Sequence, residues 1–376
     1  MNRQIENRYY PDRVSAPGET LLETLEDRGI SQADLARRMG RPHKTINEII
    51  RGKAAITPET AIQLETVLGV PAHFWSSRQL QFDQHVARRE ELERLDGYRT
   101  WLSAFPISQM VRYGWIHQRS SKAEQVNELL RFLGVASPEQ WEQVYLQTEA
   151  SFRKSRSHAS APEHVSCWLR RGEIAASKLT LAPFDGDAFR KQLATSIRGL
   201  TRSEPETFQT ELPAICSRVG VAVAFVPELP KARVSGATRW LSQDRALVQL
   251  SLRYRTDDQL WFTFFHEAAH IILHGKRDIF LEGTDVAEPG EQEDQADRFA
   301  ANALISPDDL DNFLAALPAD RYPSESRISD FAQTIGVAPG IVVGRLQHDR
   351  LPAANPISFS HYNHLKKRFR WRVDSA

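Results

Sequence analysis

The residues of this 376-residue chain with the clearest chemical pattern are two histidines and a glutamate in the segment Leu260–His274. His266 and His270 are four positions apart, so on a helix they project from one side, one turn apart, as two nitrogen ligands on one ion require. Glu267 lies beside them and is placed to polarise a water molecule rather than to ligate. The pattern predicts a zinc site with a catalytic glutamate. The alternative is an amphipathic core helix that contains two satisfied histidines.

A third ligand is available on a helix predicted over residues 291–301, which is rich in acidic side chains. This helix can bring a carboxylate to the metal from the opposite side and complete a site of two histidines and one glutamate, with water in the fourth position. We favour Glu293 as the ligand, and Glu291 and Asp294 are weaker candidates.

Two further side chains are expected to support the ligands. Asp297 lies one turn beyond the favoured glutamate and can accept a hydrogen bond from the outer nitrogen of a ligating histidine, which fixes the orientation of the ring. His274 is one turn beyond His270, but helical drift carries it away from the pair. We therefore expect His274 to be structural or to support a ligand.

The elements around this helix predict an α+β domain. Two strand-like segments with alternating or continuous apolar residues, Val219–Val226 and Ala246–Leu252, precede it. Asp257 or Asp258 can cap the helix, and Gly275 is placed to end it.

The first part of the chain has the pattern of several short helices. Apolar residues predict helices that begin near Gly18, after Ser31, at Pro42 and after Thr57, and Gly40 allows a tight turn between the second and third. Two short helices separated by a glycine turn, inside a bundle of four or five, are typical of a helix-turn-helix. The alternative is a solvated helical bundle that binds protein.

If this is a helix-turn-helix, the helix from Pro42 lies in the major groove of DNA. Side chains at its surface and its two ends can reach base edges and phosphates, and Gln32 on the preceding helix is placed for a phosphate contact. The candidate DNA-binding residues are Gln32, Arg41, His43, Lys44, Thr45, Asn47, Arg51 and Lys53.

Composition limits the class of protein. The 48 basic and 48 acidic residues exclude a uniformly basic coat for nucleic acid, so any contact with DNA must be concentrated. Cys167 and Cys216 are far apart, which excludes a disulfide framework or a cysteine-based zinc finger. This use of cysteine fits a reducing cytoplasm, where we expect the protein. Because no apolar run reaches membrane-spanning length, we expect no membrane segment.

The first part of the chain resembles the HigA-type antitoxins of the Cro/C1 (XRE) helix-turn-helix class. The similar segments are residues 17–21, Gly29–Ala36 (GISQADLA), Lys44–Lys53 (KTINEIIRGK), Ile56–Ala61 (ITPETA), Leu64 and Phe74-Trp75. The resemblance implies a dimeric repressor that binds its own operator in double-stranded DNA. Pro42-His43 departs from the family, where a small polar residue is usually followed by a basic one.

The last part resembles the ImmA/IrrE metallopeptidases, over roughly residues 211–371. The similarity rests on the HExxH motif, on the later Glu-x-x-Ala-Asp-x-Phe-Ala that begins at Glu293, and on the segment Val337–His348. It implies zinc bound by His266, His270 and Glu293, Glu267 as the general base, and cleavage of transcriptional repressors. Leu304–Pro307 departs slightly from the family, where Leu-Leu-Met-Pro is frequent.

These observations predict a mainly α protein with a small β component. We expect a helix-turn-helix bundle over residues 15–80, a helical connector over 81–210 that contains a buried Trp168, and an α+β zincin-like metallopeptidase domain over 211–372. The leading hypothesis is an autorepressor whose peptidase domain cleaves a partner, or the chain itself within residues 76–100, in response to stress. One alternative is a non-enzymatic antitoxin or sensor that binds a toxin or a ligand. The other is a plain transcription factor with a degenerate metal site.

Overall fold

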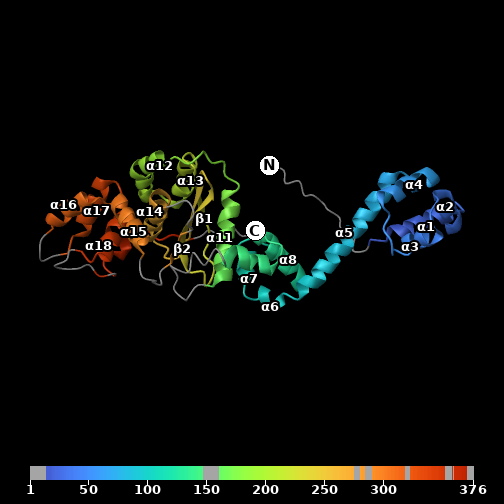
Figure 1. Cartoon of the computed structure of the whole chain (residues 1–376). Coiled ribbons are helices and arrows are strands. Elements are labelled where there is room, and N and C mark those ends of the chain that lie inside the picture. The colour runs from blue at the N-terminus through green and yellow to red at the C-terminus, as the bar shows by residue number, and fades with distance from the viewer. Residues whose placement is uncertain are drawn as a thin grey trace. The chain divides into compact units, whose positions relative to one another are not determined.

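The structure, a computed structural model, describes residues 14–146, 161–274, 280–283, 290–317, 322–351, 358 and 360–370 (Figure 1). As expected, the fold is mainly helical with one small sheet. The chain divides into two compact units, residues 1–99 with 122–124 and residues 100–121 with 125–376. No helix within the described ranges combines the length and the apolar character needed to cross a bilayer.

The first unit contains the expected bundle of short helices. These are α1 (Pro17–Asp27), α2 (Gln32–Met39), α3 (His43–Ile50), α4 (Pro58–Leu68) and the long α5 (Ala72–Asp96). The hydroxyl of Ser31 accepts a hydrogen bond from the backbone N of Asp34 at 3.1 Å and caps α2, and Thr57 caps α4 through the backbone N of Thr60 at 3.2 Å. The bundle encloses a core of buried side chains that includes Leu21, Leu35, Ile46, Leu64 and Trp75.

Two glycines set the geometry of the bundle. Gly40 ends α2 with a φ of 64°, a left-handed conformation that costs glycine little and that allows α3 to start three residues later. Gly18 lies against the end of α3, where a Cβ atom would be only 2.1 Å from the carbonyl oxygen of Ile49. Because α1 and α3 touch at this point, only glycine fits there.

The connector expected from residue 81 begins inside α5. This helix has 25 residues, most of them exposed, and ion pairs one turn apart such as Arg94–Glu91 at 2.7 Å lie on its surface. Such exposed pairs contribute little to stability. The segment is therefore a continuous helix up to Asp96.

Helical elements of the expected connector follow α5, and most of their residues belong to the second unit. They are α6 (Arg99–Leu102), α7 (Ile107–Arg112), α8 (Lys122–Leu133), α9 (Pro138–Trp141), η1 (Glu142–Leu146) and α11 (Pro162–Ala176). Residues 147–160 of the expected connector lie outside the described residues.

Helix α11 packs against the sheet, so this part of the expected connector belongs with the second unit. Trp168 is fully buried, as expected, and its Nε1 donates to the carbonyl oxygen of Val226 at 3.2 Å. The side chain of Gln249 donates to the carbonyl oxygen of Trp168 at 2.7 Å and occupies the space beside Gly172 where a Cβ atom would stand. The helix therefore lies directly on strand β3.

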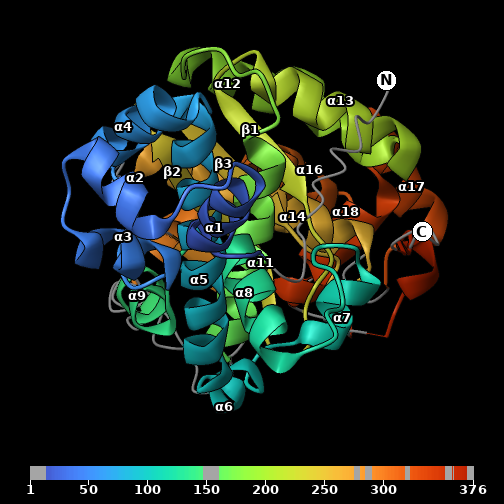
Figure 2. The same cartoon turned by 90° about the vertical axis from the view of Figure 1, so that its right-hand side faces the viewer.

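The sheet has four strands in the order β1-β3-β2-β4. They are β1 (Val221–Phe225), β2 (Val234–Ser242), β3 (Arg245–Leu250) and β4 (Phe280–Gly283), and β1 pairs with β3 in parallel whereas the other pairs are antiparallel. Strands β1 and β3 correspond to the two expected segments, and β2 and β4 were not expected. Helices α12 (Gly186–Gln192), η2 (Leu193–Ile197), η3 (Leu200–Arg202) and α13 (Pro205–Ser217) precede the sheet, and α13 runs alongside β1 (Figure 2).

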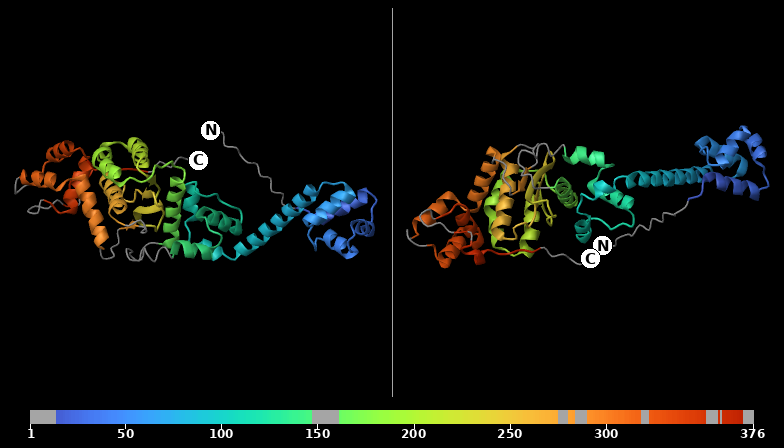
Figure 3. Two further views of the ribbon diagram at one scale, coloured as in Figure 1. Left: turned by 45° about the horizontal axis from the view of Figure 1, so that its top comes forward. Right: turned by 90° about the horizontal axis from the view of Figure 1, so that it is seen from below.

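The helix that carries the HExxH motif is α14 (Asp257–Leu273), which lies on the face of the sheet opposite α11 (Figure 3). After β4 come α15 (Glu291–Leu304), α16 (Pro307–Ala315), α17 (Glu325–Ile335), α18 (Pro339–His348) and η4 (Asn363–Leu365). Helices α15 and α18 both pack against α14. Helix α14 is therefore held on several sides.

The start of α14 differs from the expectation. Its N-cap is Thr256, so Asp257 and Asp258 do not cap the helix but lie in its first turn, where both are buried. Asp258 forms an ion pair with Lys366 at 2.6 Å, and a Cβ atom on Gly340 of α18 would lie 2.4 Å from a carboxylate oxygen of Asp257. The two acidic side chains thus fill the junction of α14 and α18. The expected end of the helix at residue 275 lies outside the described residues.

The buried Asp257 predicts a pH dependence of stability. Burial, and to a smaller extent the neighbouring Asp258, raise the pKa of this carboxyl to about 7. An acid whose pKa is raised on folding binds its proton more tightly in the folded state, so the free energy of unfolding falls as pH rises from about 4 to about 7, by at most about 1.4 kcal/mol per pH unit.

The substitution Asp257→Asn removes this titration, so we expect a flatter dependence on pH. The measurement is urea unfolding of the second unit from pH 4 to pH 8 in the presence of a chelator. Asp308→Asn, at an exposed position of α16, should leave the pH dependence unchanged. Identical pH dependence in Asp257→Asn and the unchanged protein would contradict the prediction.

Candidate metal centre and nucleic-acid interface

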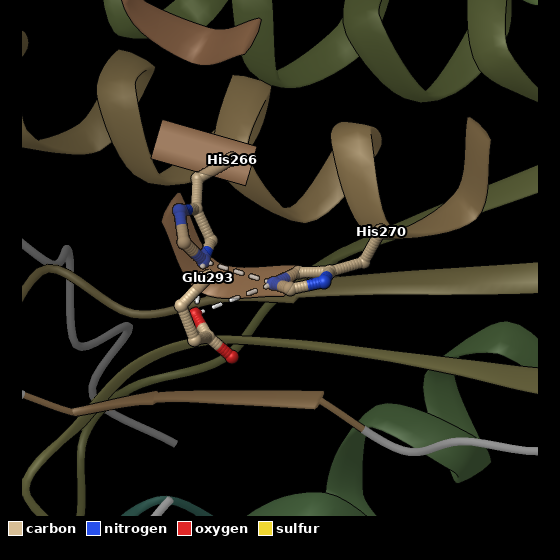
Figure 4. Close-up of side chains that lie close together, drawn as sticks. All are labelled: His266, His270 and Glu293. Carbon is tan, nitrogen blue, oxygen red and sulfur yellow. Dashed lines mark hydrogen bonds and ion pairs between the residues drawn. The ribbon is translucent and has the colours of Figure 1, made fainter. Parts of the chain in front are cut away.

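Two neighbouring helices bring together the three side chains expected to bind a metal (Figure 4). His266 and His270 project from α14, and their Nε2 atoms are 3.0 Å apart. Glu293 projects from the first turn of α15, with Oε2 3.1 Å from Nε2 of His266 and 3.6 Å from Nε2 of His270. Within the described part of the chain, this is the group of three that could hold an ion.

The spacing of these donor atoms fits zinc. In a tetrahedral site with bonds of about 2.0–2.1 Å, any two donor atoms are about 3.3 Å apart. The three observed separations of 3.0, 3.1 and 3.6 Å lie on either side of that value. Two imidazoles and one carboxylate are also the donor set of catalytic zinc sites, which keep the fourth position for water.

The protonation states of the donors suit a cation. Burial lowers the pKa of His270 to about 4, so its imidazole is neutral at neutral pH and has a free electron pair. Burial by itself raises the pKa of Glu293, but the adjacent imidazoles of His266 and His270 outweigh this effect and hold the pKa well below its usual range. Glu293 is therefore a carboxylate.

The outer nitrogen atoms of both histidines lie against polar groups. Nδ1 of His266 is 2.8 Å from Oδ1 of Asp297, the pairing that the sequence analysis expected of this aspartate. Nδ1 of His270 is 2.8 Å from Nδ1 of His274. His274, which was expected to be structural or to support a ligand, contacts the outer nitrogen of His270.

Glu267, the expected general base, is fully buried. Strand β2 places it: a Cβ atom on Gly236 would be 2.7 Å from Oε1 of Glu267, and Oγ1 of Thr238 donates to the carbonyl oxygen of Glu267 at 2.9 Å. The absence of a side chain at residue 236 therefore makes room for the carboxylate. Sequence reasoning missed both β2 residues, because β2 itself was not expected.

The two weaker candidates for the third ligand lie elsewhere on α15. Oε1 of Glu291 accepts a hydrogen bond from Gln295 at 3.2 Å, and Asp294 is exposed. Neither belongs to the group of donor atoms.

In the first unit, α2 packs against α3 and brings two of the expected DNA-binding side chains together. Nδ2 of Asn47 donates to Oε1 of Gln32 at 3.2 Å, so the two amides present one polar surface. His43, Lys44, Arg51 and Lys53 are exposed at the ends of α3, and Thr45 is half-buried. Nε of Arg41 donates a hydrogen bond to the side chain of Gln63 on α4, a contact that the sequence did not indicate.

Comparison with known proteins agrees with both parts of this description. A family model for the helix-turn-helix matches residues 21–75, and a model for the IrrE N-terminal-like domain matches residues 218–347. The HTH-type transcriptional regulator YddM of Escherichia coli is 36% identical over 63 residues, which are 17% of this chain and 67% of that protein. Virulence-associated protein I of Dichelobacter nodosus is 34% identical over 76 residues, 20% of this chain and 70% of that protein.

The chain therefore belongs, through its first unit, to the family of helix-turn-helix regulators, and its second unit carries an IrrE N-terminal-like peptidase domain. Both resemblances read from the sequence are confirmed. Solved structures similar to the first unit include a HigA-family antidote protein of Coxiella burnetii, at 28% identity over 23% of this chain and 94% of that chain, and the antitoxin HigA of Pseudomonas aeruginosa with the higBA promoter, at 31% identity over 22% of this chain and 90% of that chain. Each has a TM-score of 0.21.

The geometry predicts a specific effect of Glu293 on zinc binding. Glu293→Ala removes one of three protein donors, so we expect the zinc dissociation constant to rise by more than the roughly 10–100-fold that follows loss of an outer hydrogen-bond partner. Competition with a fluorescent chelator measures the constant. Asp294→Asn, on the same turn but exposed, is the matched control and should bind zinc like the unchanged chain. Equal losses in the two variants would argue against Glu293 as the ligand.

Proposed function

We propose that this helix-turn-helix regulator is also a zinc-dependent endopeptidase that cleaves a partner protein in response to stress. The observation that supports the peptidase is the convergence of His266, His270 and Glu293 from two helices at the spacing of one tetrahedral ion. An IrrE N-terminal-like domain over residues 218–347 contains all three.

Different side chains have different roles in the proposed hydrolysis of a peptide bond. Bound zinc would polarise the scissile carbonyl and make water more acidic. His266, His270 and Glu293 would hold the ion, and Asp297 orients the ring of His266 through Nδ1. The carboxylate of Glu267 accepts the proton of the attacking water and delivers it to the leaving amine.

The first unit binds operator DNA as a homodimer in this proposal. Basic and amide side chains gather on α3 and at its ends, where the reading helix of this fold meets the major groove. Gln32 and Asn47 present their paired amides to the bases and phosphates, and Arg51 and Lys53 contact the backbone. Two copies would read half-sites one helical turn apart. We place this activity in the cytoplasm.

The structure favours a substrate other than the chain's own connector. Self-cleavage was expected within residues 76–100, but α5 runs through this segment as far as Asp96. Peptidases bind their substrates extended, and exposed loops are the preferred sites of cutting. Cleavage in α5 would require the helix to unwind, so we propose that the substrate is a separate protein, a toxin or another repressor.

The DNA-binding proposal predicts two kinds of effect. Asn47→Ala, which removes a contact with a base edge, should lower the preference for the operator by about 1–3 kcal/mol. Lys53→Ala should weaken binding to all sequences. It should also reduce the slope of log affinity against log salt concentration by about one, as expected for the loss of one phosphate contact. Fluorescence anisotropy on DNA from upstream of the chain's own gene, at several salt concentrations, measures both. Arg89→Ala, an exposed basic residue of α5, should change neither quantity.

The peptidase proposal predicts cleavage that depends on Glu267. The zinc-loaded chain is incubated with lysate of stressed host cells, and new protein N-termini are identified by mass spectrometry. We expect a small set of cuts that disappear with Glu267→Gln and with a chelator, while Glu267→Gln still binds zinc because no ligand is lost. Zinc binding without any Glu267-dependent cut would refute the peptidase and favour a non-enzymatic antitoxin or sensor.

A further inference from the structure

The two histidines of the metal centre have different outer partners. His266 faces the carboxylate of Asp297, the kind of partner that commonly orients a ligating imidazole. His270 faces a second imidazole, that of His274, at 2.8 Å between the two Nδ1 atoms. Two identical nitrogen atoms at this distance require that one carries a proton and the other does not.

The contact with His274 is the first link of a longer chain of hydrogen bonds. Nε2 of His274 lies 3.4 Å from Oε1 of Gln295, and Nε2 of Gln295 donates to Oε1 of Glu291 at 3.2 Å. His274 is fixed at the end of α14 by a backbone hydrogen bond to the carbonyl oxygen of His270 at 3.2 Å. The chain therefore joins the last turn of α14 to the first turns of α15, the two helices that supply the ligands.

The direction of every hydrogen bond in this chain follows from its last member. A carboxylate only accepts, so Glu291 turns the NH₂ group of Gln295 toward itself and the amide oxygen toward His274. That oxygen also only accepts, so Nε2 of His274 carries a proton, and in the tautomer protonated at Nε2 the other nitrogen, Nδ1, is an acceptor. Nδ1 of His274 then accepts from Nδ1 of His270, which leaves Nε2 of His270 with a free electron pair.

We propose that His274 and Gln295 are positioning residues, which hold His270 in the tautomer and orientation that a zinc ligand needs. The inference rests on the proposed metal centre. It assigns to His270 a neutral relay in place of the carboxylate that serves His266, and the relay sets zinc affinity without touching the ion. The free electron pair of His270 points at the position that His266 and Glu293 share.

The test is the zinc dissociation constant of the full chain, measured by chelator competition. Loss of an outer partner lowers metal affinity about 10–100-fold, so we expect His274→Leu to weaken zinc binding by that factor. His274→Gln offers a carbonyl oxygen to Nδ1 of His270 and should restore most of the affinity. His348→Ala, an exposed histidine of α18, is the matched control and should bind zinc normally.

Two variants of Gln295 test the direction of the relay. Gln295→Glu keeps an acceptor opposite His274 and should bind zinc at least as tightly as the unchanged chain. Gln295→Leu removes the acceptor, and its affinity should lie between those of the unchanged chain and His274→Leu. If Gln295→Glu is as weak as Gln295→Leu, the assigned direction is wrong.

Further measurements separate positioning from other roles. X-ray absorption of zinc-loaded His274→Leu should show the same number of nitrogen ligands as the unchanged chain, and the melting temperature of the metal-free protein should change little. A lost nitrogen ligand would make His274 a ligand and overturn the inference, as would unchanged affinity in His274→Leu. If the unchanged chain binds no zinc, the proposed metal centre itself fails, whereas normal binding in all variants refutes the relay alone.

Discussion

The structure of the second unit depends on how α14 packs against the sheet and against α18. Three glycines lie directly against side chains of α14. Gly236 of β2 lies against Glu267, whereas Gly340 and Gly344 of α18 lie against Asp257 and Asp258, respectively. A Cβ atom at any of these glycines would come within 2.7 Å of a side-chain atom of α14. Because α14 carries both histidines, a shift at any contact would move the proposed ligands.

The same helix connects the stability of the fold to the chemistry of the centre. Its first turn is buried among acidic and basic groups, where Lys366 bridges Asp258 and Gln347 of α18. Its last turns carry the donors and end at His274, which is hydrogen-bonded both to His270 and toward α15. Helix α14 is therefore anchored by ionic contacts at one end and by the relay at the other. Between them, its apolar side chains fill the core that the sheet shares.

The first unit combines a local concentration of basic side chains with close packing of its helices. Overall charge is balanced, yet exposed basic side chains gather around α3, which gives a local surface for a polyanion. The side chains behind that surface pack tightly enough for α1 and α3 to meet at Gly18. A rigid bundle that presents a short polar helix suits recognition of DNA, because little order has to be gained on binding.

Predictions from sequence succeeded where the determining contacts are local. The helices of the first unit were predicted because capping hydroxyls, helix-ending glycines and apolar spacing act within a few residues. Strand β2 was missed because Val234–Ser242 contains Gly236, Thr238 and Arg239 and lacks a clean alternation, and most of it is buried on both faces by α11 and α14. The capping role expected of Asp257 was wrong because its partner surface, α18, is about eighty residues further along the chain.

The sequence by itself determined that His266 and His270 share one side of a helix with Glu267 next to them, because helical geometry relates residues four apart. It also determined the pattern of the helix-turn-helix. Only the tertiary structure decided that Glu293 and not Glu291 or Asp294 meets the histidines, and that α11 lies on the sheet. These relations depend on how segments distant in the chain pack together, and that packing is set by the shape of the whole core rather than by local spacing.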